Sequence, residues 1–242
     1  MLPAICLAAT AGLALAGCGG HSDHVSQART VVPPPASTTT TTAGLSAGVA
    51  TAAADAINLK LSDLPGTWQD AGSASGITSL APCLGIPPSP LIADVNTPLF
   101  QDVGDGNGHV TSHIVAYPSA EAAASDFSVT SKPNFTSCTE QAAQSSLTAA
   151  SAIPQGSTFV AHFIPSPAAG NDRVVALETD ILLGQGGAPL VYGQEVIVVS
   201  GPFEIYLTNL SRNPVSASLM DQLTSVLVQR ADAAVSSLQP GG

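Results

Sequence analysis

Cysteines are the residues of this 242-residue chain with the clearest chemical options. A thiol can be acylated, can pair in a disulfide, or can bind a metal or act in redox chemistry as a thiolate. The chain has four of them: Cys6, Cys18, Cys83 and Cys138. No Cys-x-x-Cys spacing occurs, and this disfavours a redox or metal-binding pair. We therefore use the position of each cysteine in the chain to decide whether it is acylated or forms a disulfide.

Cys18 closes a short apolar N-terminus. The residues Leu15-Ala16-Gly17-Cys18 resemble a bacterial lipobox, in which the cysteine is acylated and becomes the new N-terminus. Residues 1–17 have the length and the small final residues of a signal peptide, although no Lys or Arg precedes the apolar run. We expect a signal peptide over residues 1–17 and an acyl chain such as palmitate on Cys18. A buried N-terminal helix and a secretory signal without lipidation are the alternatives.

Residues 18–44 form the next compositional unit. Three prolines at 33–35 and a threonine run from Thr38 to Thr42 dominate it. Such a segment buries too little apolar surface to offset its chain entropy, so we expect a disordered tether. His21 and His24 are expected to be solvated, and the threonine run is a candidate for O-glycosylation. Residues 45–242 should then form a single domain.

Cys83 and Cys138 remain once the signal peptide is removed and Cys18 is acylated. Outside the cytoplasm a remaining pair is expected to form a structural disulfide. Closing a loop of about 55 residues stabilises the folded state by roughly 4 kcal/mol in the chain-entropy model.

Histidines offer little further chemistry. His109 and His113 lie four residues apart in a predicted strand, which places them on one face but roughly 13 Å apart, too far to share a metal. His162 is expected to be a packed or surface residue. The chain has no Gly-x-Ser-x-Gly, His-Glu-x-x-His, Walker or dinucleotide motif. We therefore expect no enzyme activity, no cofactor, no catalytic residue and no metal site.

Acidic residues give two weak candidates. Glu178 and Asp180 alternate on one predicted strand, and Glu195 and Glu204 on later strands are expected to extend a solvated acidic sheet face. The run from Asp102 to Gly108 superficially resembles a calcium loop. It lacks the glycine and the glutamate that such a loop needs, so a tight hairpin or loop is the better interpretation.

Hydrophobic periodicity supplies the elements that position these residues. The strands are predicted at residues 109–117, 157–164, 173–183, 190–199 and 203–210. The helices are predicted at residues 45–57, from the N-cap Ser119 to Phe127, at 137–150, and after Asn213-Pro214. On the first helix the buried face is expected to hold Leu45, Val49, Ala52, Ala53 and Ile57, and Trp68 should anchor the entry segment to the core.

This order of elements predicts an α+β fold. About five antiparallel strands should pack against helices, with a C-terminal amphipathic helix and one disulfide. On the C-terminal helix the apolar stripe comprises Val215, Leu219, Leu223, Val226, Leu227, Ala231 and Ala234.

Charge excludes some classes of partner. The chain has 17 acidic and 6 basic residues, and the net charge is −11. Phosphate backbones and anionic headgroups would be repelled, so we expect no nucleic-acid binding and no electrostatic adhesion to membranes. Attachment to a membrane should depend on the lipid of Cys18 alone, and the domain is expected to be a monomer.

Two segments resemble the extracellular sensor domain of mycobacterial PknH-type serine/threonine kinases and related actinobacterial lipoproteins. The first runs from Ser112 to Ser119 and leads into Ala122-x-x-x-Asp126-Phe127; the second is Phe135-Thr136-Ser137-Cys138. The resemblance covers residues 58–238. Phe135 stands where tryptophan is common, and the second disulfide typical of those kinase domains is absent. The resemblance implies an extracytoplasmic module that binds a ligand or a partner.

The expected function is therefore that of a non-enzymatic, lipid-anchored binding module, similar to a sensor domain, on the outer face of the cell membrane. A carrier of lipid or another apolar molecule is the alternative. It would need an enclosed cavity lined by residues such as Phe127, Leu182, Val198 and Leu227. A hydrolase is a third reading, and it would need convergent polar groups in one pocket.

Overall fold

The computed structural model describes residues 45–73, 80–104, 108–149, 154–166, 173–183 and 187–238. The signal peptide, Cys18 and the tether therefore lie outside the described residues. Among the described residues, no helix has the length and apolar content needed to cross a bilayer.

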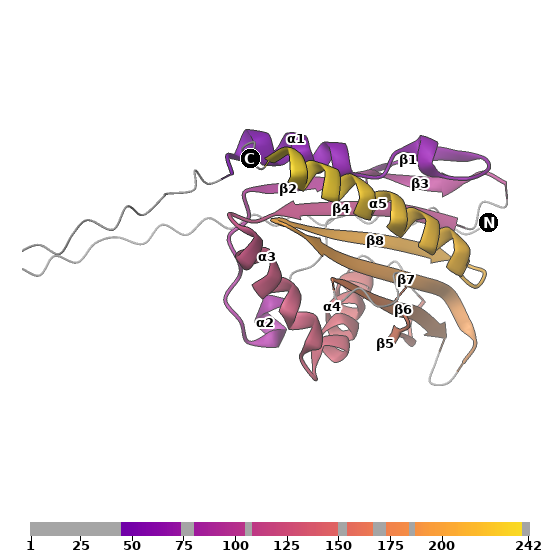
Figure 1. Cartoon of the computed structure of the whole chain (residues 1–242). Helices are drawn as coiled ribbons and strands as arrows, with labels where there is room; N and C mark the ends of the chain where they lie inside the picture. Colours follow the sequence, from indigo (N-terminus) through magenta and orange to yellow (C-terminus); the bar gives the residue numbers. More distant parts are fainter. Residues whose placement is uncertain are drawn as a thin grey trace, which may run out of the picture.

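A twisted antiparallel sheet is the centre of the fold (Figure 1). Its strand order is β1-β3-β4-β8-β7-β6-β5, and β2 pairs with β4. The strands are β1 (Trp68–Ser73), β2 (Ala93–Asn96), β3 (Pro98–Asp102), β4 (Gly108–Ala116), β5 (Ser157–Ile164), β6 (Val174–Leu183), β7 (Pro189–Ser200) and β8 (Phe203–Ser211). All five predicted strands are present, as β4 to β8, and the α+β class is confirmed.

The sheet has eight strands, so the expectation of about five was too low. The three additional strands, β1 to β3, lie in a stretch rich in Gly, Pro and Ser, which has low intrinsic strand propensity. They form because β4 offers its free edge to β2 and β3, and β1 then pairs with β3. Pairing with an existing strand thus outweighs local propensity here.

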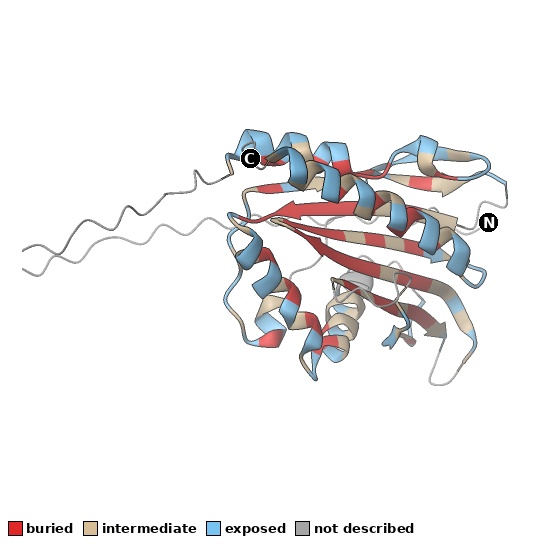
Figure 2. Ribbon diagram, viewed as in Figure 1, coloured by how far each residue is buried: buried red, intermediate tan, exposed pale blue. Residues whose placement is uncertain are grey.

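One face of the sheet packs against two helices, α1 (Ala47–Ile57) and α5 (Ala217–Leu238). This core is apolar and includes Ile114, Val196, Ile205, Leu223 and Leu227, all at most 2% exposed. Figure 2 shows the buried residues of the central strands as nearly continuous red bands. The two helices thus cover the face opposite the one that carries the polar groups described below.

The buried face of α1 differs from the expected one. Ala50, Ala54 and Ile57 are buried, whereas Val49 is 48% exposed and Ala52 is exposed. Alanine is apolar on every side of such a helix, so the periodicity of the sequence left its rotation undetermined.

The other face packs against α2 (Ala81–Leu84), α3 (Ala120–Phe127) and α4 (Phe135–Ala149). The Ser119 side chain accepts a hydrogen bond from the Ala122 amide, as expected of the N-cap of α3. Ala123 and Phe127 then point into the second core. Figure 1 shows these three helices gathered near one end of the sheet.

Side chains of α4 close the outer edge of β5. The amides of Phe159 and Ala161 donate to Gln144 Oε1 and Glu140 Oε1, each at 2.9 Å. An edge strand with satisfied amides is protected from pairing with another chain.

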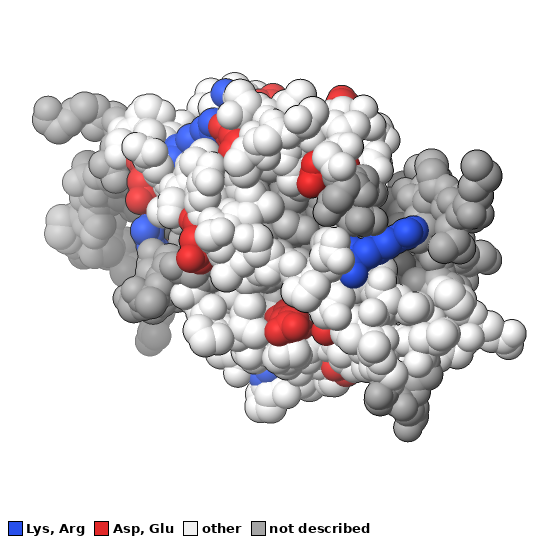
Figure 3. Space-filling model, turned by 90° about the vertical axis from the view of Figure 1, so that its right-hand side faces the viewer, with Lys and Arg blue, Asp and Glu red and all other residues white. Residues whose placement is uncertain are grey.

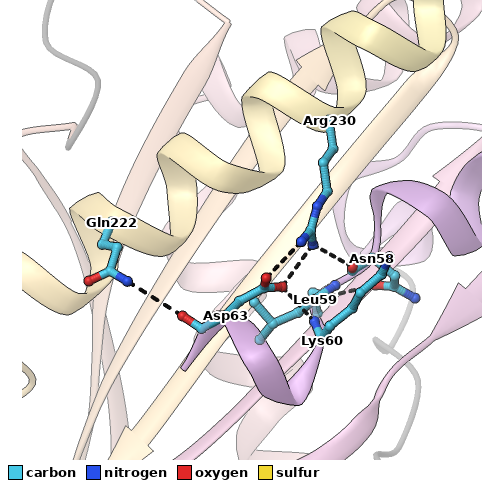
Figure 4. A network of polar contacts seen from close by, with 7 residues as sticks. Asn58, Leu59, Lys60, Asp63, Gln222 and Arg230 are labelled. Carbon is cyan, nitrogen blue, oxygen red and sulfur yellow. Dashed lines mark hydrogen bonds and ion pairs between the residues drawn. The ribbon is translucent and has the colours of Figure 1, made fainter. Parts of the chain in front are cut away.

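A polar network joins α5 to the segment that follows α1 (Figure 4). The Arg230 guanidinium donates to both carboxylate oxygens of Asp63, at 2.6 and 2.7 Å, and to the carbonyl of Asn58 at 3.0 Å. Burial alone would raise the pKa of Asp63, but the hydrogen bonds and charge of Arg230 outweigh it and lower that pKa. The Ser112 hydroxyl of β4 completes the connection by donating to Asn58 Oδ1 and accepting from the Leu59 amide. This network fixes α1 and α5 to the sheet.

Candidate functional site

A group of polar side chains lies on the sheet face that α2, α3 and α4 partly cover. His113 of β4 lies on this face with Tyr206 of β8 directly opposite, and their rings stack with centroids 5.7 Å apart. His113 Nε2 is 2.6 Å from Asp94 Oδ1 of β2. Three strands therefore contribute to one polar centre.

Four further contacts form what we call the carboxyl–tyrosine network, made of Tyr117, Asp126, Glu204 and Tyr206. The Tyr117 hydroxyl lies 2.8 Å from Asp126 Oδ2 and 3.0 Å from Glu204 Oε2. Tyr206 also hydrogen-bonds to Glu204. Ser89 adds a bond to Asp126 Oδ1 at 2.6 Å. The network thus links β8, the end of β4 and α3.

Burial dominates the protonation of this network. Glu204 is 2% exposed, and desolvation, reinforced by the nearby Asp126 carboxyl, raises its pKa to about 8. Desolvation and the same carboxyls raise the pKa of Tyr117 and of Tyr206 well above the usual range. At neutral pH Glu204 therefore keeps its proton.

A half-buried row continues the same face beyond the network. Thr111, Thr208 and Glu195 lie directly opposite one another across β4, β8 and β7. Desolvation raises the pKa of Glu195 to about 7. We refer to Thr111, His113, Glu195, Tyr206 and Thr208 as the polar strip. It offers hydroxyl, imidazole, phenol and carboxyl groups on a rigid sheet.

His113 is poorly placed to act as a general base. Asp94 and His113 form an acid–base pair, but His113 is 8% exposed and its Nδ1 is buried without a hydrogen-bond partner. A general base must reach the proton that it removes. Among the described residues, no group of three or more His, Cys, Asp or Glu side chains could hold a metal ion.

The prediction that Glu178, Asp180, Glu195 and Glu204 share a solvated acidic sheet face is wrong. Glu178 and Glu195 have opposite orientations on adjacent strands, since Glu195 pairs with Leu177 and Glu178 pairs with Gln194. Asp180 is 8% exposed and accepts from the Gly193 amide, and Glu204 is fully enclosed beneath α3. The four carboxyls therefore do not form one solvated surface.

The remaining candidates have structural roles. His162 is exposed and lies 3.2 Å from Glu178, and desolvation lowers the pKa of half-buried His109. β3 and β4 pair antiparallel, and the Gly104 amide donates to Asp102 Oδ1 just after β3; residues 105–107 of the expected hairpin lie outside the described residues. Trp68 is half-buried against the core, with its indole N–H donating to the Pro65 carbonyl.

The residues named for an apolar carrier do not line one cavity. Val198 and Leu227 pack in the core beneath α1 and α5, whereas Phe127 packs beneath α3 on the opposite face of the sheet. A groove of about 620 Å³ lies between α1 and α5, but it is open and shallow and contains none of these residues.

Cys83 and Cys138 form the expected disulfide, with Cα atoms 5.7 Å apart. It joins α2 to α4 beneath the sheet. Cys138 is 1% exposed and Cys83 is exposed, so the bond borders both the second core and solvent.

Charged side chains are sparse on the surface. Figure 3 shows isolated acidic and basic groups on a face that is mainly uncharged.

The sequence did not single out Tyr117, Asp126 or Tyr206 as a site. Tyr117 ends one strand and Asp126 lies in the next helix, nine residues later, while Glu204 lies 87 residues from Tyr117. A carboxyl at an otherwise apolar strand position, such as Glu204 between Phe203 and Ile205, was the available signal.

Comparisons with known proteins identify one distant structural neighbour and no family. No family model matches the chain, and no curated protein matches it. Among solved structures it is similar to the crystal structure of the extracellular domain of PknH from Mycobacterium tuberculosis, at 14% identity and a TM-score of 0.43. The match covers 77% of this chain and 97% of that chain. At this level it carries no conclusion about function.

Proposed function

We propose that this chain is a non-enzymatic binding module of the extracytoplasmic face of the cell membrane, comparable to a sensor domain. In this proposal residues 1–17 are removed, Cys18 carries the lipid, and residues 18–44 tether the domain of residues 45–242. A ligand or partner binds at the polar strip.

The disulfide supports the location. Cys83 is exposed, so the reductants of a cytosol would have access to the bond. Structural disulfides persist in oxidising compartments and are rare in the cytosol. A lipidated Cys18 agrees with this location, because lipobox cysteines are modified during export.

The polar strip is the observation that carries the binding proposal. Fixed polar groups on a sheet give orientation to a bound molecule, and the half-buried Thr111, Thr208 and Glu195 keep part of the strip accessible. The opposite face of the sheet is covered by α1 and α5 over its central strands. The enclosed position of His113 Nδ1 argues against a catalytic use of the same groups.

Isosteric variants test this proposal. Thr208→Val removes a hydroxyl from the strip, and Glu195→Gln removes an ionisable carboxyl. Both changes nearly preserve side-chain volume. We expect native mass spectrometry of the chain purified from membranes to show a co-purified species. The two variants should reduce its occupancy at least tenfold, which corresponds to a loss of about 1.4 kcal/mol or more.

Thr51→Val and Glu178→Gln are the matched controls. Thr51 is exposed on α1, and Glu178 lies on the other side of β6 from the strip. Equal occupancy in strip and control variants would place binding elsewhere. An unliganded, monomeric wild-type chain from membranes would contradict the proposal itself.

A further inference from the structure

The carboxyl–tyrosine network contains fewer protons than its contacts require. The Tyr117 hydroxyl lies within hydrogen-bond distance of two carboxyl groups, Asp126 at 2.8 Å and Glu204 at 3.0 Å. A hydroxyl carries one proton, so Tyr117 cannot donate to both carboxyls at once. A proton on Glu204 resolves this, since its carboxyl O–H donates to Tyr117 while Tyr117 donates to Asp126.

We infer that the network is a pH-sensitive contact that holds α3 on the sheet while Glu204 is protonated and releases α3 when Glu204 ionises. Glu204 belongs to β8 and Tyr117 directly follows β4, whereas Asp126 belongs to α3. The contact therefore spans the boundary between the helix and the sheet.

The groups facing Glu204 give an ionised carboxyl two phenol hydrogen bonds but no opposite charge. From α3 it faces Asp126, from the end of β4 it faces Tyr117, and from its own strand it faces Tyr206. Its direct partners are Val199 on β7 and Val115 on β4, and His113 stacks on Tyr206. The one charge acting on Glu204 is thus the like charge of Asp126.

Few other contacts hold α3. It is eight residues long, and Ala123 and Phe127 are its buried residues. Ala124 and Ser125 are exposed. Repulsion between Asp126 and an ionised Glu204 acts directly on this short helix, and its release exposes the apolar groups beneath it. Locally weak elements of this kind open before the rest of a domain.

Hydrogen–deuterium exchange at pH 6 and pH 9, corrected for intrinsic exchange, tests the inference. We expect the amides of α3 in the full chain to lose at least tenfold in protection at pH 9, while those of α5 change much less. Glu204→Gln keeps a donor toward Tyr117 and cannot ionise, so its α3 should stay protected at both pH values.

Asp126→Asn separates repulsion from simple desolvation. It removes the facing charge and leaves Glu204 buried, so we expect α3 to lose less protection at pH 9 than in the wild type but more than in Glu204→Gln. Equal protection of wild-type α3 at pH 6 and pH 9 would overturn the inference. So would an unchanged pH response in Glu204→Gln, or a loss of protection in α5 as large as in α3.

Discussion

The free energy of unfolding of the wild-type domain is expected to fall between pH 5 and pH 9, and Glu204→Gln should remove most of that fall. An unfolded glutamate ionises near its ordinary pKa of 4.5, whereas burial keeps Glu204 protonated up to about pH 8. Between these values the folded state binds more protons than the unfolded state, so stability is lost as the pH rises. The shift corresponds to about 3–5 kcal/mol.

Urea unfolding at several pH values measures this effect. At pH 5 the Glu204→Gln variant should match the wild type within about 1 kcal/mol, because glutamine preserves volume and a donor toward Tyr117. Glu195, whose pKa is raised to about 7, should leave a smaller residual slope. Glu178→Gln, a half-buried carboxyl on the other side of the sheet, is the control and should retain the wild-type profile. A flat wild-type profile would mean that Glu204 is not protonated in the folded state.

Loss of the disulfide should lower the free energy of unfolding by an amount comparable to the pH effect of Glu204. We expect the double variant Cys83→Ala, Cys138→Ala to lose about 4 kcal/mol of unfolding free energy, since the bond closes a loop of 55 residues in sequence separation. The loss should be concentrated in the helical layer beneath the sheet, because the bond joins α2 to α4. Urea unfolding without reductant is the measurement.

Reduction of the wild type supplies the control for that prediction. Cys83 is exposed, so a dithiol reductant should reach the bond and lower the wild-type stability to that of the double variant. The double variant itself should not respond to reductant. A difference below about 1 kcal/mol between oxidised wild type and double variant would show that the bond constrains little.

Much of the architecture could be predicted because the strong signals were local. The five runs that became β4 to β8 are rich in β-branched and aromatic residues, and Ser119 was a clear N-cap. β1 to β3 were missed because their stability comes from pairing with β4, which no local pattern records. The rotation of α1 was missed because its alanines give no apolar stripe.

The candidate site was harder to predict because the register of strand pairing decides which side chains share a face of the sheet. Glu195 and Glu204 were expected on the acidic face with Glu178, yet the pairing of Leu177 with Glu195 turns Glu178 to the other side. A shift of one residue in pairing exchanges the two faces of a strand. The contacts of Tyr117 with Asp126 and Glu204 join three elements, so they follow only from the assembled fold.

The mass of the mature chain isolated from membranes tests the central claim most directly. An exported, lipid-anchored module should begin at Cys18, carry acyl chains there, and lack two hydrogen atoms because Cys83 and Cys138 are joined. The account predicts all three features in one species from the membrane fraction. A chain that retains residues 1–17, carries no lipid on Cys18 and has free thiols at Cys83 and Cys138 would contradict it.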